Sequence, residues 1–375
     1  MKNYLKNYQL TLTVKGPVFV GSGEVIQKNE YFIHPKTKEV CVSDQRKMYQ
    51  FFVDQGLENE YLKFLRNAKK ANFGGLIREC DLSFDQVAKA CAYRLSGGDA
   101  LRKNARQAQV MAIIKDPFGK PYIPGSTLKG MLRTILLASD LIADNRGKYE
   151  NDYQQIDDNV FGNKRMSRTR FLQRENRSME TTMFHTLNRP KSKKRDMVND
   201  FMSGLLVGDS EPLEMSDCVL CQKIDVHKSG MERELPLFRE CLKPGTVIRF
   251  PLTIDTTVCK LTSAQILKAA SVFAEKHFEH FVSYFNSKAK PKNNAVPDVY
   301  LGGGTGFISK TVVYSLYTEH MDGVEATQQI FEKTRVPRFH KHNQDLRLKV
   351  SPHVLKCTHY NGQTLQMGLC NMQIK

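Results

Sequence analysis

The order of strand-like and helix-like segments is similar in the two halves of the chain, and this repetition limits the possible folds more than any other feature. Residues 8–20 are rich in β-forming residues and partly alternate, and a helical period follows at Ser126–Leu141. In the second half, strand-like segments at Val219–Val226 and Thr246–Ile254 precede a helical period over Ala264–Phe285. Helices on one face of an antiparallel sheet are typical of ferredoxin-like domains. The sequence therefore predicts an α+β fold with two ferredoxin-like units.

The two predicted units and the segment that connects them divide the chain into three parts. A length of 375 residues is enough for two average domains, each with its own core. We expect a first domain over 1–145, with a helical insertion at about 45–95, and a second domain over 201–375. The segment 146–200 is polar, dense in charge and nearly free of aliphatic periodicity, so we expect a mobile basic loop or linker there.

The charge balance indicates a polyanionic partner. The chain has 56 Lys and Arg against 39 Asp and Glu, a net charge of +17, which favours nucleic acid or an anionic membrane surface. No apolar run approaches the roughly 20 residues that span a bilayer, and the N-terminus lacks the apolar core of a signal peptide. The nine cysteines are odd in number and scattered through apolar segments, which is typical of reduced, buried thiols. We therefore expect a cytoplasmic protein that binds nucleic acid and no membrane.

The segment PYIPGSTLKGMLRT carries the clearest local signal for anion binding. Gly125, Ser126 and Thr127 stand where a helix would begin, with Ser126 or Thr127 as its cap, and exposed N–H groups there bind anions. Lys129 and Arg133 are four residues apart, so they share one helix face and could contact adjacent phosphates. An ordinary capped helix with two solvated cations explains the same pattern equally well.

A glycine-rich loop in the second half is the next candidate. Its backbone could approach a polyanion closely, with Lys310 nearby, although a tight turn between packed elements explains it as well. A dinucleotide fingerprint is excluded because Phe307 stands where its last glycine must be. The candidate residues of this loop are Gly302, Gly303, Gly304 and Gly306.

Two basic stretches within 146–200 favour RNA. Like charges at this density repel one another unless phosphates or other anions neutralise them, and interleaved Phe161, Phe171 and Phe184 could stack on bases. A solvated surface is the alternative. The basic residues are Lys164, Arg165, Arg168, Arg170, Arg174 and Arg177 in the first stretch, and Arg189, Lys191, Lys193, Lys194 and Arg195 in the second.

The metal-binding and cofactor-binding patterns in the sequence are incomplete. Cys218 and Cys221 have the spacing of a zinc pair but lack a second pair. His277 and His280 lie on the expected long helix without an HExxH motif. We therefore expect no metal, no cofactor and buried thiols at the cysteine pair.

The patterns for catalysis are also incomplete. The segment GGDA around Asp99 lacks the second acid that a metal pair of a nucleotide polymerase needs. His185 could act as a general base, which leaves a metal-independent, RNA-processing endoribonuclease as the alternative function. No partner acid for His185 is apparent, so we expect no catalytic residues.

Five motifs in order along the chain carry a family resemblance. VFVGSGE, PYIPGSTLKGMLRT, GLLVGDSE, LGGGTGF and the ending SPHVLKCTHYNGQTLQMGLC together resemble the fifth Csm subunit of type III-A CRISPR–Cas effector complexes, in the RAMP superfamily. The matches extend from about residue 10 to residue 370, so they cover nearly the whole chain. The motif PGSTLKG is shared by several RAMP subfamilies. Its combination with the glycine-rich loop and the C-terminal motif is specific to a smaller group of proteins.

The resemblance implies two RRM-like RAMP domains and a non-catalytic role. Such a subunit caps one end of a protein filament, holds the 3′ part of the guide RNA, and contributes to guide maturation in antiviral defence. Its partners are the guide RNA, a neighbouring RAMP backbone subunit and other Csm subunits. On this sequence, the expected RNA surface comprises Gly21, Ser22, Gly23, the segment Gly125–Lys129, Arg133 and the loop Gly302–Gly306.

Overall fold

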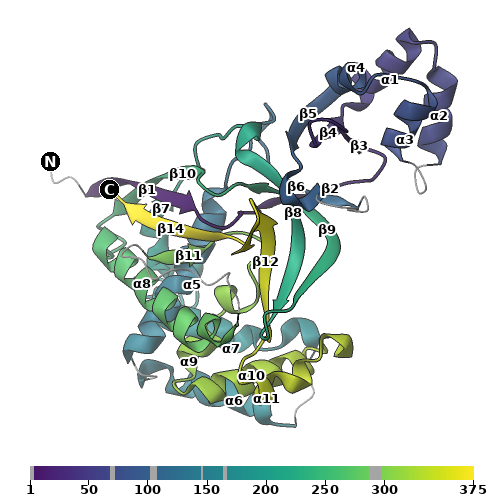
Figure 1. The fold of residues 1–375 in the computed structure, drawn as a ribbon. Coiled ribbons are helices and arrows are strands. Elements are labelled where there is room, and N and C mark those ends of the chain that lie inside the picture. The colour runs from purple at the N-terminus through teal and green to yellow at the C-terminus, as the bar shows by residue number, and fades with distance from the viewer. Residues whose placement is uncertain (1–3, 68–71, 102–107, 145–146, 164–166, 287–296) are drawn as a thin grey trace.

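Two β-sheets form the framework of the molecule, with helices packed against them (Figure 1). The computed structural model describes residues 4–67, 72–101, 108–144, 147–163, 167–286 and 297–375. The strands are β1 (Leu5–Val14), β2 (Gly21–Ile26), β3 (Tyr31–Ile33), β4 (Glu39–Ser43), β5 (Cys91–Ser96), β6 (Val110–Ile113), β7 (Leu205–Val207), β8 (Cys218–His227), β9 (Glu232–Leu242), β10 (Val247–Asp255), β11 (Asp298–Tyr300), β12 (Val354–Tyr360), β13 (Gln363–Gln366) and β14 (Leu369–Ile374). The helices are α1 (Gln45–Asp54), α2 (Glu58–Arg66), α3 (Phe73–Glu79), α4 (Phe84–Val87), α5 (Gly125–Asp144), α6 (Glu150–Phe161), α7 (Gln173–Phe184), α8 (Ser263–His280), α9 (Val313–Leu316), α10 (His320–Lys333) and α11 (Asp345–Leu348).

The first sheet has five strands in the order β11-β14-β1-β10-β7, all antiparallel neighbours. The alternating apolar residues of β1, including Leu10 and Leu12, are fully buried. They pack with α5 and α8, whose residues Leu128, Leu132 and Ile266 belong to the same core. The α+β class and the two long helices predicted from periodicity are confirmed here.

The second sheet runs β2-β6-β9-β8-β5-β4-β3, with β12 pairing to β8 and β13 to β12. Two of its pairings, β5 with β8 and β6 with β9, are parallel. In both sheets, strands from before residue 145 pair with strands from after residue 201. The two halves of the sequence therefore share both sheets, and the N- and C-terminal strands lie side by side (Figure 1).

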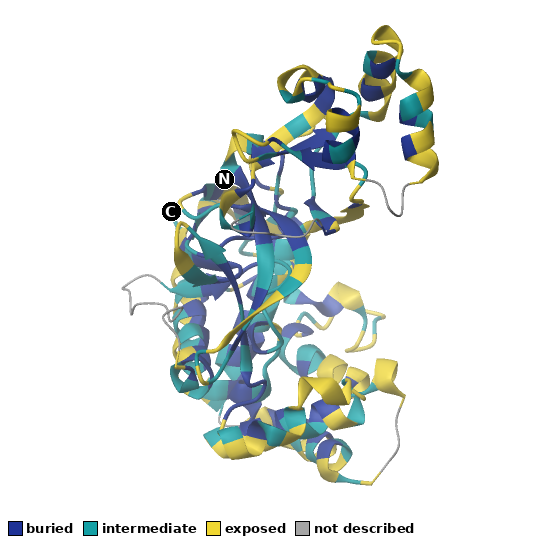
Figure 2. Cartoon of the chain, turned by 45° about the vertical axis from the view of Figure 1, so that its right-hand side comes forward, coloured by how far each residue is buried: buried dark blue, intermediate teal, exposed yellow. Residues whose placement is uncertain are grey.

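Helices α1–α4 form a lobe that projects from the second sheet (Figure 1). The lobe has its own core, in which the rings of Phe52 and Tyr61 stack at 4.6 Å between centroids. Figure 2 shows this small group of buried residues apart from the larger core of the sheets. The helices of the expected insertion end at Val87, and β5 then carries the chain back into the second sheet.

Two helices, α6 and α7, lie within the range 146–200 that the charge pattern predicted as a loop. Each contributes only a few apolar side chains to the main core, among them Ile156 and Val160 from α6 and Met179 from α7. Few apolar residues suffice because the rest of the molecule already supplies the core against which they pack. This sparse pattern explains why the sequence showed no aliphatic period there.

A buried carboxylate connects three strands of the second sheet. Glu240 on β9 is fully buried. It accepts hydrogen bonds from the Tyr93 hydroxyl (2.6 Å), the Ile113 N–H (3.0 Å) and the Lys115 ammonium (2.6 Å). Burial raises the pKa of Tyr93 and the Glu240 charge raises it further, so the phenol remains a donor. The Glu240 side chain therefore fastens β5 and β6 to β9.

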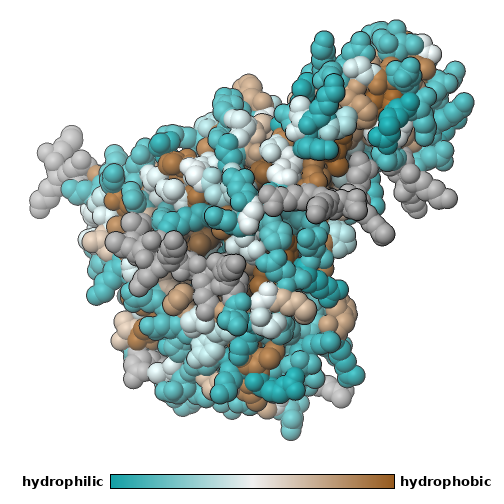
Figure 3. Space-filling model, in the orientation of Figure 1, coloured by the Kyte–Doolittle hydropathy of each residue, from teal (hydrophilic) through white to brown (hydrophobic). Residues whose placement is uncertain are grey.

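Most of the face in Figure 3 is hydrophilic, and its apolar areas are small and separate. Among the described helices, none combines the length and the apolar character that a membrane span requires.

We expect Glu240→Ala to lower the free energy of unfolding by about 3–5 kcal/mol, because the Lys115 charge would lose its partner in a buried site. Urea denaturation of the full chain measures this loss. The control is Glu211→Ala, which breaks an exposed pair with Arg249 at 3.8 Å and is expected to cost less than about 1 kcal/mol. Equal losses in the two variants would contradict the role of Glu240.

Candidate nucleic-acid interface

The glycine-rich loop follows β11 and requires glycine for two physical reasons. Gly302, Gly304 and Gly306 have φ values of +81°, +79° and +98°, a region that side chains rarely adopt. A Cβ on Gly302 would also lie 2.2 Å from the Phe19 carbonyl oxygen. The Gly303 N–H donates to that same oxygen at 2.6 Å. The loop is thus held firmly against the chain that leads into β2.

This contact brings together two glycine segments that are far apart in the sequence. Gly21, Ser22 and Gly23 follow Phe19 almost directly and are exposed. Strand β2 begins at Gly21, with a bulge against β6 between Gly21 and Val25. The bulge accommodates the glycines within a strand, because an extra residue relaxes the regular pairing.

A basic pocket of about 430 Å³ lies beside the glycine-rich loop. The loop contributes Gly304 and Gly306, and Lys310 follows shortly after. The opposite wall comes from three strands of the second sheet, with Lys223 on β8, Arg239 on β9 and Lys356 on β12. We call this set of residues the loop pocket.

The cations of the loop pocket are only partly neutralised. Burial lowers the pKa of Lys223, and the charges of Lys356 and Arg239 lower it further. Burial also lowers the pKa of Lys310. Of these groups, Lys356 has an ion pair, to Asp225 at 2.8 Å. An anion that enters the pocket would relieve this repulsion.

Arg239 supplies a fixed donor in the loop pocket. Its side chain is buried, and its guanidinium carbon lies 5.5 Å from the centroid of the Phe19 ring. Within the part of the chain that the structure describes, its buried Nε finds no hydrogen-bond partner. Because a buried charged donor without an acceptor is costly, this atom favours an anionic ligand in the pocket.

Sequence reasoning missed Lys223, Arg239 and Lys356. Each is a single basic residue within a strand-like segment, separated from the others by many residues. In the sequence, the only signal for such a residue was a charge among apolar strand residues. Lys223, for example, lies between Cys221 and Ile224, which are buried in the structure. Strand order alone brings the three together.

The N-terminus of α5 already has an internal anion. The Gly125 N–H donates to a carboxylate oxygen of Asp209 at 2.8 Å, and a Cβ on Gly125 would lie 2.4 Å from the Val207 carbonyl oxygen. The helix begins at Gly125, so the cap predicted at Ser126 or Thr127 is wrong. A carboxylate from the distant GLLVGDSE motif performs that role instead.

Arg133 and Lys129 share a face of α5, as the spacing predicts, but their environments differ. Arg133 pairs with Glu180 at 2.9 Å and Asp200 at 2.7 Å, and its guanidinium lies 4.1 Å from the Phe184 ring centroid. Lys129 has a lowered pKa, mainly because of burial. Arg133 therefore holds α7 and the segment after it, whereas Lys129 is the freer cation.

A second basic cleft, of about 1160 Å³, lies between α5 and α7, and we call it the α7 cleft. It collects Ser126, Lys129 and Arg133 of the expected RNA surface, and Arg174, Arg177 and Arg195 of the two basic stretches. A third cavity, of about 530 Å³, shares Gly130 and Arg133 with the α7 cleft and Lys310 with the loop pocket. The two basic sites are thus neighbours along one side of α5.

The first basic stretch contains three more of the predicted RNA contacts. Lys164 and Arg165 fall outside the described residues, and Arg168 is exposed in the turn 168–170. His185, the candidate general base, lines the α7 cleft but is buried. Its Nδ1 lies 3.0 Å from the Lys194 carbonyl oxygen, to which it donates.

The remaining sequence candidates are structural. Cys218 and Cys221 are buried in β8, as predicted. Burial lowers the pKa of His277 to about 3 and that of His280 to about 4, so both are neutral at physiological pH. Asp99 accepts a hydrogen bond from the Gly362 N–H at 2.7 Å and so fixes the turn before β13.

We expect Arg133→Ala to lower the free energy of unfolding by roughly 1–3 kcal/mol, because it leaves the buried Asp200 carboxylate without its cation. Chemical denaturation measures the change. Lys268→Ala, which removes an exposed lysine from α8, is the control and should be nearly neutral. A neutral Arg133→Ala would show that Arg133 is not a structural residue.

Comparison with known proteins places these features in a family. Residues 11–307 match the family model of the RAMP superfamily. The chain is 32% identical over 403 residues to the CRISPR system Cms protein Csm5 of Mycobacterium tuberculosis, covering 100% of this chain and 99% of that protein. It is 29% identical over 325 residues to Csm5 of Streptococcus thermophilus, covering 83% of this chain and 82% of that protein.

Two solved structures have a similar fold. One is a chain in a cryo-EM structure of a Csm–crRNA–target RNA ternary complex of a type III-A CRISPR–Cas system, with a TM-score of 0.65 and 17% identity over 98% of this chain and 100% of that one. The other is the crystal structure of T. onnurineus Csm5, with a TM-score of 0.59 and 18% identity over 96% and 99% of the two chains. They show the fold; the family model and the full-length relative at 32% identity show that the chain belongs to the RAMP superfamily and, within it, to the Csm5 family.

Proposed function

We propose that the protein is a non-catalytic, RNA-binding subunit of a type III-A CRISPR effector complex. In this role it holds the 3′ part of the guide RNA, caps one end of the backbone filament beside a neighbouring RAMP subunit, and contributes to guide maturation in antiviral defence in the cytoplasm. The likeness to a chain from a Csm–crRNA–target RNA complex supports the class of partner.

The loop pocket is the observation that carries this proposal. Its lysines and Arg239 converge on one side of the glycine-rich loop, of which Gly304 and Gly306 line the pocket. Backbone N–H groups without side chains beside them and charge-assisted donors are the usual partners of phosphate. Contacts to phosphate carry no sequence information, so we expect binding without strong sequence preference.

The α7 cleft extends the proposed surface. Lys129, Arg174 and Arg177 line it and are not held by ion pairs within the described ranges. A strand of RNA that runs from the loop pocket to this cleft would pass the cavity between them, whose cations are Lys310 and Arg133. Gly125 and Arg133 act in this surface indirectly, since they hold α5 and α7 in place.

Binding is proposed without catalysis. A general base must reach its substrate directly or through one water, and the buried His185 ring already donates from Nδ1 to a backbone carbonyl. Its position is explained by the support it gives to the segment around Lys194. The basic residues of the two sites act as phosphate contacts.

We expect the double variant Lys223→Ala/Lys310→Ala to bind single-stranded RNA more weakly and with a shallower dependence on salt. Each phosphate contact of a single strand contributes about −0.7 to the slope of log K against log salt. Losing two contacts should therefore reduce the slope by about 1.4. Fluorescence anisotropy with a labelled RNA over a KCl series measures the slope for the full chain.

The matched control removes two exposed lysines, Lys260 just before α8 and Lys268 within it, in the variant Lys260→Ala/Lys268→Ala, which has the same net charge. Its slope should stay close to that of the wild type if the loss is local. Equal slopes for the two double variants would mean that only net charge matters, and the loop pocket would not be the RNA site. A larger effect from Lys129→Ala/Arg177→Ala would move the main contact to the α7 cleft.

A further inference from the structure

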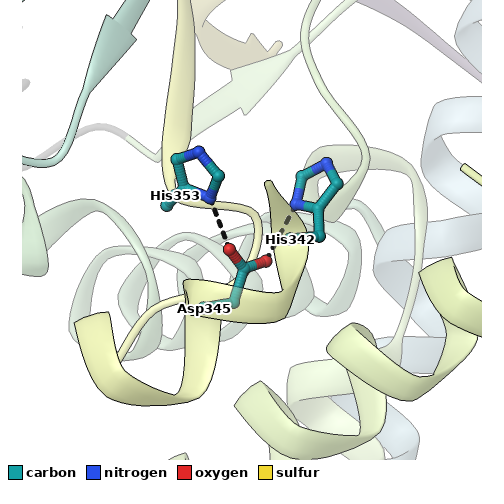
Figure 4. A group of neighbouring side chains, drawn as sticks. All are labelled: His342, Asp345 and His353. Atoms are coloured by element: carbon teal, nitrogen blue, oxygen red, sulfur yellow. Dashed lines mark hydrogen bonds and ion pairs between the residues drawn. The ribbon is translucent and has the colours of Figure 1, made fainter. Parts of the chain in front are cut away.

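Two histidines and an aspartate meet in the segment between α10 and β12, and none of them lines the proposed RNA surface. Asp345 is the first residue of α11, His342 lies in the turn before it, and His353 directly precedes β12 (Figure 4). The Asp345 side chain is fully buried, and those of His342 and His353 are 15% and 9% exposed. The group therefore lies just beneath the surface, within reach of a small ion.

The three side chains turn their donor atoms toward one point. Figure 4 shows the Nδ1 atoms of both imidazoles facing the carboxylate, one toward each oxygen. His342 Nδ1 lies 2.9 Å from Oδ2, and His353 Nδ1 is hydrogen-bonded to Oδ1. One atom from each residue lies within 4.8 Å of the other two. This spacing allows all three to bind a single cation.

The buried carboxylate of Asp345 concentrates negative charge between the two imidazoles. Within the described residues, its ion-pair partners are His342 and His353 alone, and the Ser351 hydroxyl donates to Oδ2 at 2.5 Å. A buried carboxylate is costly unless it is hydrogen-bonded or faces a positive charge. A divalent ion would neutralise the carboxylate while using both imidazoles as ligands.

Aromatic rings hold the two histidines in this orientation. The His227 ring packs edge-on against His353 at 5.2 Å between centroids, and the Phe331 ring lies 4.4 Å from His342. The His340 ring lies 6.0 Å from His342. Surroundings that restrict ligand side chains are a regular feature of metal sites, because they reduce the entropy lost on binding.

We propose that His342, Asp345 and His353 form a binding site for one first-row divalent transition metal ion, with Zn²⁺ as the best match. Imidazole nitrogen favours such ions over Mg²⁺ and Ca²⁺, which prefer oxygen ligands. Two histidines and one carboxylate leave a fourth position for water or a further ligand. The ion would join α11 to the start of β12 and so help to position Lys356 of the loop pocket, three residues after His353.

Cobalt binding to the purified full chain tests this site directly. Co²⁺ substitutes for Zn²⁺ and absorbs visible light when bound to nitrogen and oxygen ligands of a protein. We expect an absorption that saturates at one Co²⁺ per chain and disappears when Zn²⁺ is added. His353→Ala and Asp345→Asn should each abolish it. The control is His359→Ala. His359 lies on β12, the strand that follows His353, and pairs with Glu232 of β9 at 3.2 Å. Its removal should leave the absorption unchanged.

Thermal unfolding gives a second readout that does not depend on how well the variants fold. Zn²⁺ should raise the Tm of the wild type, and EDTA should reverse the rise. The proposal is overturned if the wild type shows no cobalt absorption, if the absorption survives in both ligand variants, or if it carries a thiolate-to-cobalt band from the free cysteines. A Tm that responds to pH but not to Zn²⁺ or EDTA would likewise overturn it, and the cluster would then share a proton.

Discussion

The pairing of β1 with β10 on one side and β14 on the other is the interaction on which the rest of the structure depends. It joins the beginning of the chain to its end and to the centre of its second half. The residues after β1 are fixed by the same pairing, because Gly368 donates to the Pro17 carbonyl and Leu301 to that of Gly368. The glycine-rich loop and Phe19 can therefore meet only after both halves of the chain have folded together.

The charged groups of the molecule fall into two classes that differ in how fully they are neutralised. Glu240, Arg133 and Asp209 make short bonds to partners from distant parts of the chain, and such bonds hold elements together. Lys223 and Lys310 lie in partly buried positions with lowered pKa values. A cation that is desolvated and repelled by its neighbours adds little to folding. This contrast is the physical basis for separating structural charges from the proposed binding charges.

The histidine cluster connects the C-terminal segment to the same framework. His353 lies at the entry to β12, whose pairing with β8 places Lys356 opposite Asp225. Any ion or proton held by Asp345 thus affects a strand that lines the loop pocket. The sequence predicts no metal site because two cysteine pairs and an HExxH helix, the common zinc patterns, are both missing. His342 and His353 are eleven positions apart, a spacing that no common motif contains.

The sequence by itself determined the α+β class, the long helices α5 and α8, the excess of positive charge and the family, because these depend on local periodicity, composition and contiguous motifs. The glycines of the loop were also visible there. Only the tertiary structure decided that Asp209 caps α5, that Arg133 is an internal ion-pair partner, and that α6 and α7 are helices. It alone brought Lys223, Arg239 and Lys356 into one pocket. Strand order and register set these contacts, and both depend on the packing of the whole chain rather than on neighbouring residues.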